Sequence, residues 1–117
     1  MPEKQITIKQ IQDWERDFCK KKGIVFDKDE QMRIAIYKLV EEVGEITKAV
    51  LEKNWDELLA EVSDVIIFAS KVANVAEDGY VEDKLEDVLQ RKIGYCEQRT
   101  YNAETRKFDK PVNNEFK

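Results

Sequence analysis

The 117-residue chain has no histidine, and it has only two cysteines, two prolines and four glycines. The absence of histidine excludes the usual zinc sites, the Ser-His and Cys-His nucleophile pairs and the Glu-x-x-His motif of di-iron bundles. Cys19 and Cys96 form no metal-binding or redox motif, so we expect both to be reduced and structural. So little proline and glycine does not suit an all-β protein with many turns. Because the chain has no histidine and no metal-binding cysteine motif, any metal must be bound by oxygen.

Long apolar runs are also missing. A membrane-spanning helix needs about 20 apolar residues, and Lys71 interrupts the best candidate. The N-terminus lacks the basic-then-apolar pattern of a signal peptide, so we expect a cytoplasmic protein with no membrane partner. A net charge of −5 argues against a nucleic-acid partner, because such proteins are usually basic. The length suits a single domain over residues 1–117.

Helical periodicity and capping signals predict an all-α fold with four helices and no strand. Capping boxes open the first three helices, and Gly23 suits a left-handed end for the first. The tail from about residue 101 has no periodicity and is expected to be extended or ordered by a ligand. The predicted helices run from Thr7 to about residue 22, from Asp27 to about Lys53, from Asn54 to near Gly79, and roughly over residues 81–100.

The third predicted helix is apolar almost all round, which is typical of a helix buried on most sides. Three other short helices do not suffice to cover it. We therefore expect the four-helix bundle to assemble into a homodimer or a homotetramer.

Acidic pairs interrupt the apolar side of the two central helices. Glu42 and Glu45 border the stripe that contains Val43 and Val50, while Glu61 and Asp64 border the apolar side of the next helix. Most such acids are solvated, and that is the plain alternative. However, a short loop makes these helices antiparallel neighbours, so the acids can converge, and converging carboxylates repel one another unless cations lie between them. All-oxygen ligation favours Mg²⁺ or Mn²⁺.

The segment EEVGE (Glu41 to Glu45) followed by EVSD (Glu61 to Asp64) resembles the EExxE…ExxD signature of the MazG-like all-α NTP pyrophosphohydrolases. The resemblance implies that Glu42, Glu45, Glu61 and Asp64 hold Mg²⁺, with Mn²⁺ as the other candidate. It implies that Glu41 is a nearby acid that orients water. The implied reaction cuts a nucleoside triphosphate to the monophosphate and pyrophosphate, in a role that cleans the nucleotide pool.

Candidate substrate-binding residues lie elsewhere in the chain. Lys92, Cys96 and Arg99 would share one face of the fourth helix, where the resemblance implies a Lys, Asn and Arg grouping. Cys96 departs from that grouping, and a solvated surface is the alternative for the two cations. Trp14 and Trp55 are candidates to stack on a base, with plain core positions as the alternative.

Two functions are consistent with these features. The leading one is a metal-dependent nucleotide pyrophosphohydrolase. The other is a helical nucleotide-binding or regulatory interaction protein without turnover. Release of pyrophosphate from a panel of nucleoside triphosphates distinguishes them.

Overall fold

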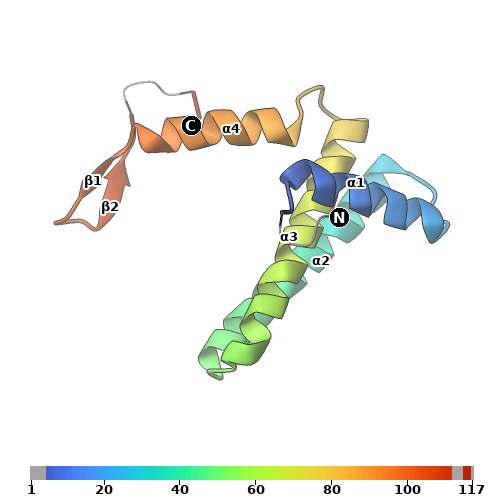
Figure 1. The fold of residues 1–117 in the computed structure, drawn as a ribbon, viewed down its shortest axis with the longest axis horizontal. Helices are drawn as coiled ribbons and strands as arrows, with labels where there is room; N and C mark the ends of the chain where they lie inside the picture. The colour runs from blue at the N-terminus through green and yellow to red at the C-terminus, as the bar shows by residue number, and fades with distance from the viewer. Residues whose placement is uncertain (1–4, 112–114, 117) are drawn as a thin grey trace. The chain divides into compact units, whose positions relative to one another are not determined.

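The computed structural model describes residues 5–111, 115 and 116. This part of the chain forms four helices and one two-stranded sheet (Figure 1). Contacts divide the chain into two compact units, residues 1–82 and residues 83–117. The predicted four helices are confirmed, while a single domain over residues 1–117 stays a prediction. The first unit contains α1 (Ile8–Lys21), α2 (Lys28–Leu51) and α3 (Trp55–Gly79), and the second contains α4 (Leu85–Glu97), β1 (Thr100–Asn102) and β2 (Lys107–Asp109).

Helix α1 begins and ends as its sequence predicts. The Thr7 hydroxyl accepts a hydrogen bond from the Gln10 backbone N–H at 3.1 Å, and the Gln10 side chain accepts one from the Thr7 N–H at 2.9 Å. Gly23 follows the helix with a φ of 77°, a left-handed conformation that glycine adopts at little cost.

Helices α2 and α3 form an antiparallel hairpin with a short turn (Figure 1). Asp27 caps α2 by accepting a hydrogen bond from the Glu30 N–H at 3.1 Å. The predicted capping box at Asn54 is wrong, since its side chain makes no capping hydrogen bond within the described part of the chain. Its backbone N–H instead donates to the Ala49 carbonyl at 2.8 Å. The short connection is what brings the acids of the two helices to the same level.

The core of the first unit is thin. Ala35, Ala49 and Val75 are buried apolar residues of α2 and α3, but Val43 and Val50 are 48% and 43% exposed. The predicted inner stripe of α2 therefore faces solvent in part. Large apolar side chains that stay exposed on the hairpin also include Ile36, Val40, Leu59 and Ile66.

The second unit departs from the sequence-based prediction. Helix α4 begins at Leu85 rather than near Val81, whose N–H still donates to the Ala76 carbonyl at the end of α3 at 2.9 Å. The tail is not irregular: Thr100 pairs with Asp109 in an antiparallel ladder. Asn102 accepts backbone hydrogen bonds in the turn between the strands, which is a common device of tight turns.

Across the residues that the structure describes, no helix is both long and apolar enough to cross a bilayer.

Candidate metal centre

Three carboxylates converge between the two helices of the hairpin. Glu42 comes from α2, and Glu61 and Asp64 come from successive turns of α3. One carboxylate oxygen of each lies within 4.8 Å of the other two, and all three side chains are half-buried. Residues three apart on a helix lie on one face, so α3 presents both of its acids to the same point. We call these three residues the acidic triad.

The other two predicted acids lie outside the triad in the described structure. Glu45 follows Glu42 by one turn of α2 and is exposed. Glu41 is exposed as well, and one of its carboxylate oxygens lies 3.5 Å from the Lys38 ammonium group. Their roles as a metal ligand and a water-orienting acid stay predictions.

The triad concentrates negative charge. Partial burial of Glu42 raises the pKa of its carboxyl group, and the charges of Asp64 and Glu61 raise it further, with smaller contributions from Glu41 and Glu45. A raised pKa means that the folded chain disfavours the ionised form. An ion held by all three oxygens would reverse this effect, and hard oxygen donors in such a number suit Mg²⁺ or Mn²⁺.

A family model, the MazG nucleotide pyrophosphohydrolase domain, matches residues 31–102. The chain belongs to this family. The matched segment begins in the first turn of α2, ends at the last residue of β1, and contains the whole acidic triad. Neither the curated proteins nor the solved structures gave a match to the chain.

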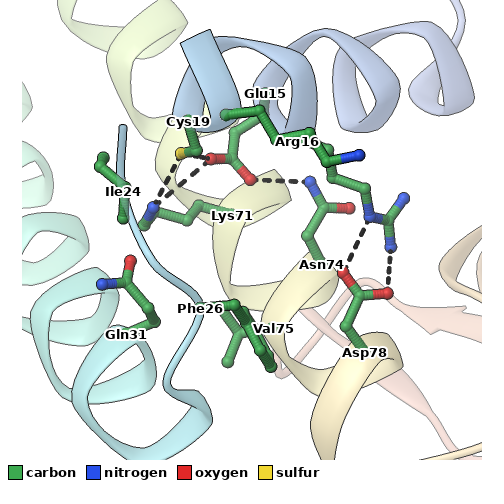
Figure 2. A pocket seen from close by; sticks show the side chains of 11 residues that line it. Glu15, Arg16, Cys19, Ile24, Phe26, Gln31, Lys71, Asn74, Val75 and Asp78 are labelled. Carbon is green, nitrogen blue, oxygen red and sulfur yellow. Dashed lines mark hydrogen bonds and ion pairs between the residues drawn. The ribbon is translucent and has the colours of Figure 1, made fainter. Parts of the chain in front are cut away.

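A cavity of about 340 Å³ lies in the first unit of this MazG domain, between α1, the start of α2 and the second half of α3 (Figure 2). Buried polar side chains build its wall. Asn74, which is 2% exposed, donates to the Gln12 carbonyl at 2.9 Å and to Glu15 Oε1 at 2.8 Å. Its own side-chain oxygen accepts a hydrogen bond from Gln12 at 3.0 Å. These bonds join α1 to α3.

The other oxygen of Glu15 lies among two further polar groups. Glu15 Oε2 accepts from the Cys19 thiol at 2.7 Å, and the Lys71 ammonium lies 3.4 Å from the same oxygen. Burial raises the pKa of the Cys19 thiol, and the hydrogen bond to Glu15 raises it further. Cys19 is therefore a neutral donor at neutral pH, consistent with the reduced, structural role expected for it.

Arg16 closes the opposite side of the cavity (Figure 2). Its guanidinium donates to both oxygens of Asp78, at 3.0 and 3.1 Å, and to Glu77 at 2.9 Å. The charges that surround the cavity are thus largely paired with one another.

A second cavity of about 390 Å³ shares part of this wall and is lined further by residues of α1, α2 and α3. Trp14 lines it, with its ring stacked on Phe18 at a centroid distance of 5.2 Å. Trp55 is 57% exposed and lines neither cavity. Stacking of either tryptophan on a base stays a prediction.

In the second unit, Lys92 and Arg99 lie on the ring of Tyr95. Their cationic groups are 5.0 and 5.4 Å from the ring centroid. Arg99 lies beyond the last residue of α4, so the expected face of three residues on one helix is wrong, and Cys96 is exposed. The Tyr95 hydroxyl and Arg99 Nε are buried without a hydrogen-bond partner among the described residues.

The polar wall of the cavity was not predicted from the sequence. Lys71 and Asn74 lie three residues apart in the apolar second half of α3, and Gln12 and Glu15 lie three residues apart on α1. Matching polar pairs at helical spacing on two helices were the available signal.

Proposed function

We propose that this MazG domain hydrolyses a nucleoside triphosphate to the monophosphate and pyrophosphate, with Mg²⁺ or Mn²⁺ bound by the acidic triad. The observation that carries the proposal is the convergence of three half-buried carboxylates within 4.8 Å, inside the segment that the family model matches. Isolated acids on a helix surface would spread apart, because like charges at this distance repel. Their convergence is explained if a cation belongs among them.

Four acids would bind the metal ion, and a fifth would orient the attacking water. Glu42, Glu61 and Asp64 would hold the ion, and Glu45, one turn further along α2, would add a fourth ligand on the exposed side. A bound divalent ion polarises a phosphoryl oxygen and lowers the pKa of a coordinated water. Glu41 would accept a hydrogen bond from the attacking water and orient it.

The phosphate groups of the substrate need cationic partners besides the metal. We infer that Lys92 and Arg99 supply them. The support is that both cations lie on one buried ring and that Arg99 Nε has no partner in the described structure. A guanidinium with an unused N–H is suited to a phosphate oxygen.

Assembly and biological role complete the proposal. The exposed apolar side chains of α2 and α3, among them Val40 at 66% and Leu59 at 74% exposure, suit a homodimer or homotetramer, because large exposed apolar surfaces mark interfaces. A monomeric mass by light scattering at micromolar concentration would contradict this. The role that we assign is removal of unwanted nucleotides from the pool.

The deciding experiment measures pyrophosphate released from a panel of nucleoside triphosphates with Mg²⁺ and with Mn²⁺. We expect Glu61→Gln to abolish the release, because it removes one charged ligand of the triad. Glu57→Gln, an exposed acid one turn earlier on α3, is the matched control and should keep wild-type rates. Binding of nucleotide without release of pyrophosphate from any member of the panel would favour the non-catalytic alternative.

A further inference from the structure

Gln31, in the first turn of α2, is a largely buried residue whose side-chain amide has no assigned role. The residue is 9% exposed and lines both of the cavities described above. Its backbone N–H donates to the Asp27 carbonyl at 2.8 Å, but its side-chain amide makes no hydrogen bond with any residue that the structure describes. An amide that lines a cavity and has no partner in the chain can donate to and accept from a molecule inside the cavity.

The neighbouring polar groups are already occupied. Asn74 and Lys71 bond to Glu15, and on the far side Arg16 is bound to Asp78. These bonds fix the shape of the wall without ligand (Figure 2). The Gln31 amide, by contrast, makes no hydrogen bond with the described residues and can bond to a ligand.

The cavity suits a flat, neutral ring with polar edges. Its apolar wall is formed by Ile24, Phe26 and Val75, and its volume is within the range of small-molecule sites, about 300–1,000 Å³. A glutamine amide carries a donor and an acceptor in one plane, and it can pair with the adjacent donor and acceptor on the edge of a nucleobase. A strongly charged ligand fits less well, because the surrounding charges are largely paired.

The second cavity is lined by Gln31 and also by residues that lie one helical turn from the acidic triad. Gln31, Lys38 and Phe68 are among the residues that line it. Lys38 precedes Glu42 by one helical turn, and Phe68 follows Asp64 by one turn. One helical turn is about 5.4 Å, so a nucleotide with its phosphates at the triad would have this cavity within reach of its base.

We propose that the first cavity, of about 340 Å³, binds the nucleobase of the substrate and that the Gln31 amide selects the base. The assignment to the substrate rests on the proposed function, whereas binding of a base by Gln31 does not. Gln31 would therefore be the residue that determines which nucleotide the domain accepts.

The test uses nucleosides, which carry no phosphate, in metal-free buffer. Calorimetric titration of adenosine, guanosine, cytidine, uridine and thymidine should show binding of at least one to the wild-type protein. Gln31→Met keeps the length of the side chain and removes its hydrogen bonds, so we expect binding to weaken about tenfold to a hundredfold. Gln31→Asn, which withdraws the amide by one methylene, should also weaken binding. Gln90→Met, on exposed α4 surface, should leave it unchanged.

Hydrolysis then distinguishes the two proposals. We expect kcat/KM for the triphosphate of the preferred nucleoside to fall in Gln31→Met by a factor similar to the loss in nucleoside affinity. An unchanged kcat/KM, or a wild-type protein that binds none of the five nucleosides, overturns the inference while the proposed hydrolysis stands. Nucleoside binding that depends on Gln31, in a protein that releases no pyrophosphate, supports the base site and overturns the hydrolysis.

Discussion

Replacement of Asn74 by alanine tests whether the buried polar wall holds α1 on α3. The side chain makes three hydrogen bonds across this contact, two to Gln12 and one to Glu15. A bond to a charged group contributes about 1.5–3 kcal/mol and a neutral one about 0.5–1.5 kcal/mol. In the variant the Gln12 amide would still donate to Glu77 at 2.8 Å, which reduces the cost of losing its bond to Asn74. We expect Asn74→Ala to lower the free energy of unfolding by about 3 kcal/mol.

Urea denaturation followed by tryptophan fluorescence measures this loss. Trp14 and Trp55 are the two tryptophans of the sequence, and both belong to the first unit, so the signal reports the unit that contains Asn74. Asn54→Ala is the control, because the Asn54 side chain makes no capping hydrogen bond in the described structure; its effect should stay below about 0.5 kcal/mol. A loss below about 1 kcal/mol for Asn74→Ala would refute the view that this network secures α1.

Three further predictions concern charge and reactivity. In metal-free buffer Glu42→Gln should raise Tm at neutral pH, because the raised pKa of Glu42 means that its ionised form destabilises the fold. This gain in Tm should shrink as the pH falls toward the ordinary pKa of glutamate, and a gain that grows there would contradict the argument. Arg99→Ala should lower kcat/KM about tenfold to a hundredfold, and Arg99→Lys should restore only part of it, as steady-state kinetics would show; equal rates for all three proteins would exclude Arg99 from phosphate binding. Iodoacetamide should alkylate exposed Cys96 well before Cys19, whose raised pKa keeps it a thiol, and peptide mass spectrometry would reveal the reverse order if this is wrong.

The acidic triad could be predicted from sequence because its determinants are local. Three-residue spacing fixes which acids share a face of each helix, and a short turn fixes the register of one helix against the other. Glu45 shows the limit of this reasoning. It follows Glu42 by three residues, as Asp64 follows Glu61, but in the structure it is exposed and lies outside the triad. A face around a helix can be read from sequence more easily than the angle at which that face meets its neighbour.

The first cavity and the β1–β2 hairpin could not be predicted from the sequence in the same way. Gln31 is an ordinary polar residue in a first helical turn, and its burial depends on how α1 crosses the two other helices. The β1–β2 hairpin carried a weak signal, since Asn102 suits a turn and the rings of Tyr101 and Phe108 pair across it at 5.2 Å. Strands of three residues are too short for alternation to be recognised.

The hairpin of α2 and α3 also has a kinetic consequence. All three triad acids lie within this local unit, so they meet as soon as its helices close, whether or not α1 has docked. Local contacts of this kind form early, because little chain entropy is lost in closing a short loop. In metal-free solution the repulsion among Glu42, Glu61 and Asp64 opposes that early step. A divalent ion bound by the triad should therefore accelerate refolding more than it slows unfolding, and the domain would then bind the ion while it folds.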